Sequence, residues 1–212
     1  MYIMRILAFV LFVIVAITSC TATRSGGSAK WIRLFDGKSF DGWKVGNNAE
    51  TFSIDSGRIK VNGKVAHLFY VGNVNNHNFK NFHFKVDVLT TPGSNSGLYF
   101  HTEYQEKGWP TAGFEVQVNN SHTDWRRTGS LYAINDVRET FVKDNEWYTQ
   151  EIVVVGKTVT VKINGKTVME YTEPANPEGP KRISSGTFAL QGHDPKSKVY
   201  YKNIMVQVLP DE

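Results

Sequence analysis

Apolar and polar side chains alternate along several short stretches of this chain, at the period of two that places successive residues on opposite faces of a β-strand. In residues 82–88, one face carries Phe82, Phe84, Val86 and Val88, and the other carries His83, Lys85 and Asp87. Residues 96–103 and 113–118 repeat this pattern. Residues 147–155, 158–163, 187–193 and 199–208 are rich in the β-branched and aromatic residues that suit strands. We therefore expect half-buried strands and no helix of useful length from Trp31 onward.

Turn signals separate these stretches and set the fold class. Asn164-Gly165 favours a type I′ hairpin, and a Pro-Gly pair interrupts the chain at residues 92–93. A sheet with one apolar face must bury that face against a second layer. The pattern predicts an all-β fold, a jelly-roll sandwich of two antiparallel sheets, as one domain over residues 31–209. We expect Trp43 and Trp147 in its core.

The N-terminal segment follows a different pattern. A single Arg5 precedes an unbroken apolar run of twelve residues, 6–17, which is too short to span a bilayer but suits an export signal. The sequence Ile17-Thr18-Ser19-Cys20 resembles the lipobox of bacterial lipoproteins, and Cys20 is the one cysteine of the chain. This predicts a signal peptide over residues 1–19, lipidation of Cys20 and a flexible tether over residues 20–30. An ordinary signal peptide with an incidental cysteine is the alternative. The expected location is the cell envelope, with a lipid anchor as the only membrane contact.

The charge argues against nucleic acid as a partner. The 212 residues are 41% hydrophobic and 21% charged, with a formal net charge of +4. No basic run is longer than Arg126-Arg127, whereas nucleic-acid binding usually needs a clustered basic stripe.

The outward faces of the expected strands carry candidate chemistry. In residues 113–118, Val116 and Val118 enter the core, and Glu115 and Gln117 face outward. By the same alternation, Tyr99 and His101 face outward from the neighbouring stretch. Other outward or loop positions add Trp109, Tyr132, Gln191 and His193. Aromatic rings and planar polar groups are what a sugar groove requires. A merely solvated face has the same alternation, so the pattern alone leaves both interpretations open.

An ordered set of motifs resembles the 3-keto-disaccharide hydrolase domain family. The set comprises Leu34-Phe35-Asp36-Gly37-Lys38, Asp41-Gly42-Trp43, the run Gly93-Ser94-Asn95-Ser96-Gly97-Leu98-Tyr99-Phe100, Gly113-Phe114-Glu115-Val116-Gln117-Val118, Thr128-Gly129-Ser130-Leu131-Tyr132, Glu146-Trp147, Asn164-Gly165-Lys166 and Phe188-Ala189-Leu190-Gln191 with His193. The resemblance implies a concanavalin A-like jelly roll and an exported enzyme acting on glycosides oxidised to a ketone at carbon 3. The family's recurrent polar positions fall on Asn95, Glu115, Gln117 and His193. Relatives often carry Arg where this chain has His101, so the resemblance does not imply which sugar this chain prefers.

Ordinary retaining hydrolysis is disfavoured by comparison with laminarinase-like glucanases of the same fold. Their active strand resembles Glu-x-Asp-x-x-Glu, and here amides Gln117 and Asn119 follow Glu115. Double displacement at an unmodified glycoside needs a second carboxyl group about 5–5.5 Å from the first.

A 3-keto sugar requires less, because its carbonyl acidifies the proton on carbon 2 and allows the glycosidic oxygen to be eliminated. We expect Glu115 or His193 to be the base, with the other assisting proton transfer. Substrate-binding residues are expected at Asn95, Gln117, Tyr99, His101, Trp109, Tyr132 and Gln191. A divalent metal held by His193, Glu115 and Asp194 is the one candidate cofactor, and the spacing matches no metal motif.

Two functions follow from these residues. One is hydrolysis or elimination at 3-keto-glycosides by an exported enzyme. The other is a non-catalytic, lectin-like carbohydrate-binding lipoprotein of the envelope. The enzyme requires Glu115 and His193 to converge on one sugar position, whereas a lectin does not.

Overall fold

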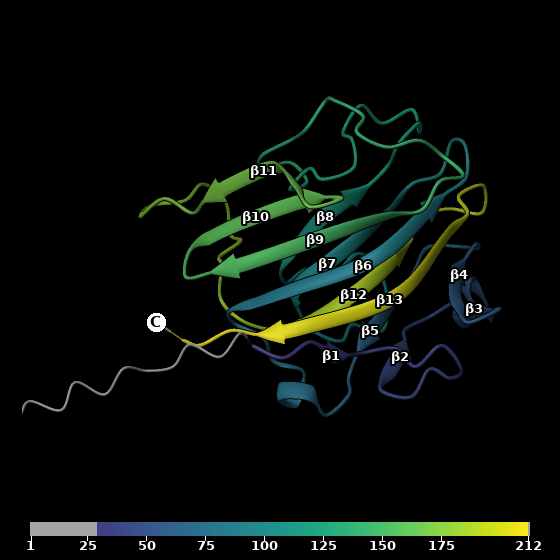
Figure 1. Cartoon of the computed structure of the whole chain (residues 1–212), viewed down its shortest axis with the longest axis horizontal. Coiled ribbons are helices and arrows are strands. Elements are labelled where there is room, and N and C mark those ends of the chain that lie inside the picture. The colour runs from purple at the N-terminus through teal and green to yellow at the C-terminus, as the bar shows by residue number, and fades with distance from the viewer. Residues whose placement is uncertain (1–28, 212) are drawn as a thin grey trace, which may run out of the picture.

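An eight-stranded antiparallel sheet forms one layer of the protein, in a computed structural model that describes residues 29–211 (Figure 1). Its strands, in spatial order, are β11 (Lys166–Thr172), β10 (Thr158–Ile163), β9 (Tyr148–Val155), β6 (Phe82–Thr90), β13 (Val199–Val208), β4 (Arg58–Val61) and β3 (Phe52–Asp55), with β1 (Ile32–Arg33) paired to β13.

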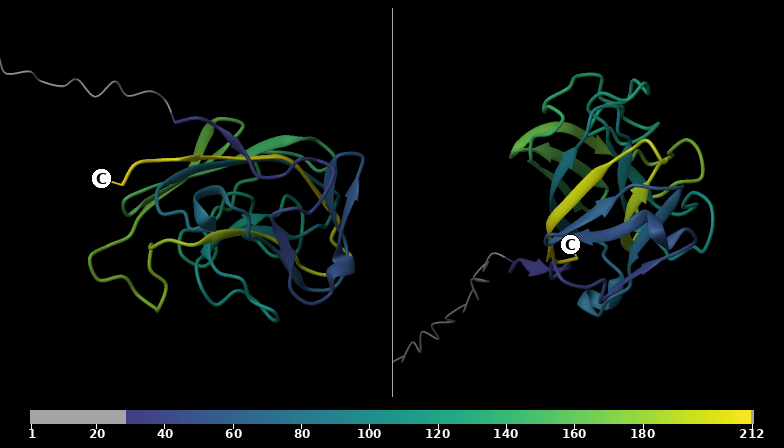
Figure 2. Two further views of the ribbon diagram at one scale, coloured as in Figure 1. Left: turned by 90° about the horizontal axis from the view of Figure 1, so that it is seen from below. Right: turned by 90° about the vertical axis from the view of Figure 1, so that its right-hand side faces the viewer.

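A five-stranded antiparallel sheet forms the second layer (Figure 2). Its spatial order is β2 (Trp43–Val45), β5 (Ala66–Tyr70), β12 (Thr187–Gly192), β7 (Ser96–Thr102) and β8 (Phe114–Val118). Two short 3₁₀ turns, η1 (Ala49–Thr51) and η2 (Val74–His77), complete the described elements. The predicted all-β sandwich of two antiparallel sheets is confirmed.

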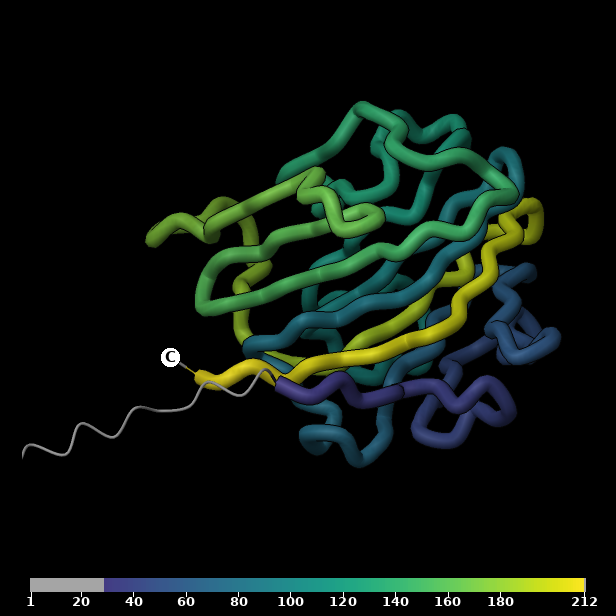
Figure 3. The backbone as a smooth tube through the Cα atoms, viewed as in Figure 1, coloured from purple at the N-terminus to yellow at the C-terminus, as the bar shows by residue number. Residues whose placement is uncertain are grey.

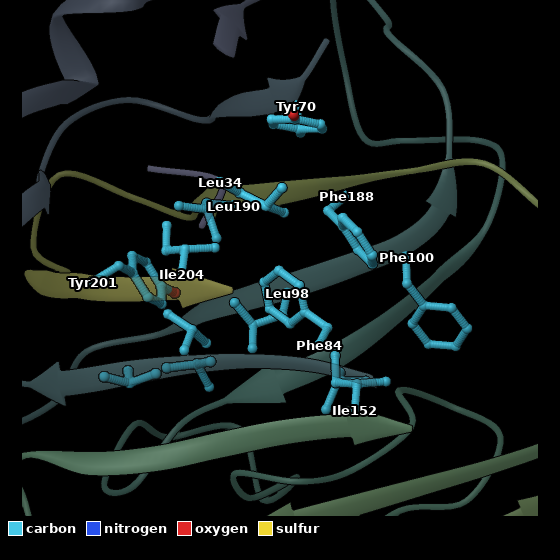
Figure 4. Packing of buried hydrophobic residues seen from close by; sticks show 14 of the residues in the cluster. Leu34, Tyr70, Phe84, Leu98, Phe100, Ile152, Phe188, Leu190, Tyr201 and Ile204 are labelled. Carbon is cyan, nitrogen blue, oxygen red and sulfur yellow. The ribbon is translucent and has the colours of Figure 1, made fainter. Parts of the chain in front are cut away.

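The core lies between the two sheets and follows the predicted alternation. Phe84 of β6 and Ile152 of β9 meet Leu98, Phe188 and Leu190 of the five-stranded sheet in one buried cluster (Figure 4). In β8, Val116 enters this cluster. The residues between these inward positions therefore lie on the outer face of the five-stranded sheet. The long connection of residues 119–147 between β8 and β9 runs above the strands in the view of Figure 3.

A β-bulge near the end of β7 breaks the alternation at His101. The pairing of β7 with β12 shifts by one residue between Tyr99 and Thr102, and His101 has a φ of 52°. Its ring packs on Phe82 and Phe100 instead of facing outward beside Tyr99. Gly186 permits the distorted backbone to pass closely, because a Cβ there would lie 2.5 Å from the carbonyl carbon of His101. The expected outward position of His101 is wrong for this reason.

The two tryptophans expected in the core have different environments. Trp43 is buried, and its indole N–H donates to the Leu34 carbonyl oxygen at 2.7 Å. Trp147 is only partly buried and lies under the ammonium of Lys202, 4.0 Å from the ring centre. Trp147 therefore belongs to the surface of the eight-stranded sheet, which corrects the expectation.

The predicted signal peptide, the lipidation site Cys20 and most of the tether lie outside the described residues. Within residues 29–211, no helix has the length and apolarity needed to cross a bilayer. The domain limits of 31–209 stay a prediction.

Candidate functional site

A cavity of about 330 Å³ opens on the outer face of the five-stranded sheet. It is lined by Asn95, Tyr99, Trp109, Pro110, Glu115, Gln117, Asp124, Tyr132, Lys181, Gln191 and His193. Strands β7, β8 and β12 form its floor, and loops form its walls. The residues at i and i+2 of β8, Glu115 and Gln117, both face it, as period-two alternation requires.

Glu115 is held from both sides by strands of the floor. Its Oε2 accepts from the Tyr99 hydroxyl of β7 at 2.8 Å, and its Oε1 accepts from Nε2 of Gln191 at 2.7 Å. Gln191 belongs to β12, so the carboxylate crosses the intervening strand β7 to reach it. It crosses at Gly97, where a Cβ would overlap Oε1 and lie 2.8 Å from Cγ of Glu115. The glycine of the Ser-Gly-Leu-Tyr motif therefore provides the space that orients this carboxylate.

The electrostatic setting of Glu115 favours the protonated form more than water does. Burial raises the pKa of Glu115 above its ordinary value of 4.5, outweighing the lowering by the hydrogen bonds from Tyr99 and Gln191. The positive charge of Lys181, and that of His193 when its ring is protonated, also act to lower the pKa of Glu115. Burial, followed by the charge of Glu115, likewise raises the pKa of Tyr99, so its hydroxyl stays a donor.

His193 forms a dyad with Asp194 at the edge of the cavity. Its Nδ1 lies 2.7 Å from Oδ2 of Asp194. Asp194 also accepts from the Ser197 hydroxyl at 2.7 Å and from the backbone N–H of Lys196 at 2.7 Å. Burial alone would raise the pKa of Asp194, but these hydrogen bonds, that from His193 first, lower it to about 2. An ionised Asp194 accepts a hydrogen bond from the Nδ1–H of His193, which leaves Nε2 of the neutral ring as the free basic nitrogen.

A chain of hydrogen bonds connects the two ends of the cavity. Nε2 of Gln117 donates to Oδ1 of Asn95 at 2.8 Å, and Nδ2 of Asn95 lies 3.4 Å from Nδ1 of His122. The backbone N–H of Asn95 donates at 2.9 Å to the Ser197 hydroxyl, which in turn donates to Asp194. The loop before β7 therefore joins the Gln117 side of the floor to the His193 dyad.

Two buried amide oxygens at the cavity floor lack partners among the described residues. They are Oε1 of Gln117 and Oε1 of Gln191, on side chains that are each 1% exposed. Leaving a buried acceptor unpaired costs about 1–3 kcal/mol, so such atoms usually mark a place where a ligand or water donates. A hydroxyl-rich ligand supplies such donors.

Trp109 forms an aromatic wall of the cavity. It is 47% exposed, and its ring lies 5.7 Å from that of His193 and 5.5 Å from that of His67. His67 is 3% exposed, and burial lowers its pKa to about 4, so it supports the wall as a neutral ring. An exposed indole over polar groups is suited to stacking on the apolar face of a sugar ring.

Eight of the residues predicted for the site come together in this cavity: Asn95, Tyr99, Trp109, Glu115, Gln117, Tyr132, Gln191 and His193. His101 does not. It lies in a separate cavity of about 530 Å³, where its Nε2 bonds the Lys80 carbonyl oxygen at 3.0 Å and its Nδ1 accepts from the Ser184 N–H at 3.3 Å.

Three further residues line the cavity and were not predicted from the sequence: Pro110, Asp124 and Lys181. All three are in loops, where no periodicity indicates which way a side chain faces. Asp124 has one local signal, since its carbonyl oxygen accepts from Nδ2 of Asn119 at the end of β8. Asn119 thus secures the loop behind the cavity and does not line it.

The metal-binding set expected from the sequence, His193, Glu115 and Asp194, does not come together. Within residues 29–211, His122, His193 and Asp194 place ligand atoms within 4.8 Å of one another, and Glu115 is not part of this group. Asp194 is already saturated by His193, Ser197 and Lys196, and Nδ1 of His122 accepts from the Asp124 N–H at 3.1 Å. Two imidazole nitrogens remain, whereas protein sites that retain zinc supply three or four ligands. We derive no step through a metal.

Residues 30–207 match the family of 3-keto-alpha-glucoside-1,2-lyase-like domains. The chain belongs to this family. The resemblance found in the motifs is thereby confirmed, and it places Glu115 and His193 in a domain of the expected kind.

Individual relatives agree with this assignment. A 3-keto-disaccharide hydrolase of Bacteroides thetaiotaomicron is 28% identical over 168 residues, which cover 66% of this chain and 58% of that protein. A crystal structure from Parabacteroides distasonis, of a protein provisionally classed as a glycosyl hydrolase, has a TM-score of 0.71 at 25% identity and covers 85% of this chain and 94% of its own. The Bacillus subtilis carbohydrate-binding module CBM66 shares the fold, with a TM-score of 0.55 at 14% identity over 78% of this chain and 95% of the module.

Proposed function

We propose that this protein cleaves the glycosidic bond of 3-keto-glycosides by removing the proton beside the ketone, eliminating the aglycone and adding water to the product. The observation that supports this most directly is that Glu115 and His193 line one cavity, each held in orientation by its own partners. The family membership and the named activity of the Bacteroides relative support the same reaction.

In this proposal, His193 is the base. Its Nε2 is free because Asp194 occupies Nδ1, and it takes the proton from carbon 2. The electron pair of the C2–H bond becomes an enolate, which then expels the oxygen on carbon 1. Glu115, whose pKa burial raises, gives its proton to that leaving oxygen. The product is a 1,2-unsaturated 3-keto sugar, and addition of water across this double bond yields the free 3-keto sugar.

The remaining residues hold the sugar in place. Trp109 stacks on an apolar ring face, and the unpaired oxygens of Gln117 and Gln191 accept from ring hydroxyls. Asn95 orients Gln117 from the side. Tyr99 has its hydroxyl committed to Glu115 and therefore acts on the carboxylate rather than on the sugar.

The experiment that tests the function is incubation of the full chain with 3-keto-trehalose or a 3-keto-glucoside and detection of released sugar. Wild-type protein should release it, and the parent glycosides without the ketone should stay intact. If the protein binds these glycans without turnover of any keto-sugar, the lectin-like alternative replaces the enzyme.

Two variants separate the roles of acid and base. Glu115→Gln should lose turnover of alkyl 3-keto-glycosides by about 10²–10⁴-fold but retain that of a 4-nitrophenyl 3-keto-glucoside, whose leaving group needs no proton. His193→Gln should lose both, together with exchange of the carbon 2 proton in D₂O measured by NMR. Reversed behaviour would make Glu115 the base.

We also propose that the protein is exported and anchored through a lipid on Cys20, on the sequence evidence of the lipobox-like segment. Metabolic labelling with an alkyne fatty acid should mark the wild-type chain and not Cys20→Ala. Equal labelling of both would contradict the anchor.

A further inference from the structure

The polar groups of the cavity floor leave the ketone with few places to bind. A ketone oxygen only accepts hydrogen bonds, whereas the floor offers unpaired acceptors at Gln117 and Gln191 and a carboxylate at Glu115. Several donors of the floor are committed to one another, because Nε2 of Gln191 and the Tyr99 hydroxyl donate to Glu115 and Nε2 of Gln117 donates to Asn95. A charged donor on the cavity wall is therefore better placed to bind the ketone.

Lys181 supplies such a donor. It is the only lysine or arginine among the residues that line this cavity, and it comes from the connection between β11 and β12. Its ammonium forms no ion pair within 4.0 Å with any carboxylate of residues 29–211. The side chain of Lys181 is half-buried. Its charge acts to lower the pKa of Glu115, and His193 acts in the same direction. Lys181 also lines the cavity of about 530 Å³ that holds His101, and its ammonium lies 5.9 Å from the centre of the Phe114 ring. A partly desolvated cation without a carboxylate partner at this position can meet negative charge that develops in the cavity.

We propose that Lys181 binds the ketone oxygen and stabilises the enolate that forms when the carbon 2 proton is removed. This inference rests on the proposed function and assigns to this chain's own lysine the polarising role that a metal would otherwise fill. As His193 takes the proton, the electron pair moves to the oxygen beside the Lys181 ammonium. The pair then returns to form the carbon 1–carbon 2 double bond, and the C1–O bond breaks as Glu115 protonates the leaving oxygen.

The burial of Lys181 agrees with this role. Burial lowers the pKa of Lys181, while the charge of Glu115 acts in the opposite direction. A less solvated ammonium donates a stronger hydrogen bond to an oxyanion than one in bulk water. Lys181 lies on a loop, whereas Glu115 lies on strand β8 of the cavity floor.

Lys181→Met tests the proposal, because it keeps much of the length and removes the charge. We expect kcat on a 4-nitrophenyl 3-keto-glucoside to fall by about 10²–10³-fold, in the range seen when one oxyanion donor is lost. Exchange of the carbon 2 proton in D₂O should fall equally, while the Kd for the parent glucoside stays within about threefold. Lys143→Met is the matched control, since Lys143 is an exposed loop lysine that does not line this cavity. It should retain wild-type turnover.

Restoring the charge keeps the test independent of folding. In a Cys20→Ser background, Lys181→Cys alkylated with 2-bromoethylamine should recover at least a tenth of wild-type kcat, and iodoacetamide should recover none. Wild-type turnover in Lys181→Met, or equal recovery with both reagents, would overturn the role of Lys181 while leaving the proposed function intact. Absence of keto-sugar turnover in the wild type would instead reject the proposed function.

Discussion

The Glu115 side chain lies across Gly97, the one glycine of β7, to reach Gln191 on β12. Gly97→Ala would place a methyl group against Oε1, Cγ and Cδ of Glu115 and displace the carboxylate. We expect kcat/KM on a 3-keto-glucoside to fall at least tenfold. Gly93→Ala is the control, because a Cβ there meets nothing within 4 Å although φ is +73°. It should lose about 1 kcal/mol of unfolding free energy and keep its activity. Equal activity of both variants would remove the role assigned to Gly97.

Asp194→Asn should invert the hydrogen bond to His193. The Asn amide would take the place of Oδ2 and donate to Nδ1, so that the imidazole proton moves to Nε2, the nitrogen needed as base. We expect kcat to fall by about 10²–10⁴-fold, as when a carboxylate that orients a catalytic histidine is lost. Steady-state kinetics measure this, and unchanged kcat would show that Asp194 does not set the tautomer. Glu151→Gln, which alters another His–carboxylate pair on β9, should leave kcat unaffected.

The same carboxylate should make the fold sensitive to acid. The pKa of Asp194 is about 2 in the folded state against 3.8 ordinarily, so its stabilising contribution is complete above pH 3.8 and is lost as pH falls toward 2. Allowing for partial exposure, about 1–2 kcal/mol is at stake. Urea unfolding of wild type and Asp194→Asn should therefore differ at pH 5 and converge near pH 2. A constant difference across this window would contradict the assignment.

Trp109→Ala should weaken substrate binding more than chemistry. The indole is exposed at the cavity wall, and no hydrogen bond joins it to Glu115. Loss of a stacking ring is worth about 1–3 kcal/mol, so KM should rise about 10–100-fold with kcat within about threefold. Trp125→Ala, at another exposed tryptophan that does not line the cavity, should change neither constant. A fall in kcat with unchanged KM would place Trp109 in the chemical step.

His101→Leu tests where the bulge places this residue. Its two ring nitrogens bond Lys80 and Ser184, and burial lowers its pKa to about 4, so it serves the fold as a neutral ring. Removing both hydrogen bonds should cost about 1–3 kcal/mol of unfolding free energy. The Kd for the parent glucoside, measured by calorimetry, should stay within about threefold. A tenfold loss of affinity at unchanged stability would return His101 to the sugar site.

The sequence predicts the strands and the cavity floor because one physical rule governs both. Period-two alternation places Glu115 and Gln117 on one face, and any sheet with a buried opposite face must expose them together. The rule fails at His101, where one extra residue and a positive φ reverse the side chain. It is silent for Lys181, because the direction of a loop side chain depends on tertiary contacts that local sequence does not encode. The orienting role of Gly97 becomes visible only when β8, β7 and β12 are placed side by side.

The pairing of β1 with β13 determines which way the cavity points relative to the start of the domain. The chain enters the sandwich along the eight-stranded sheet, whereas the cavity opens on the far side of the five-stranded sheet. The chain therefore enters the domain on the face opposite the cavity opening. In a protein tethered through its N-terminal segment, as proposed above, this arrangement would leave the opening accessible to solvent.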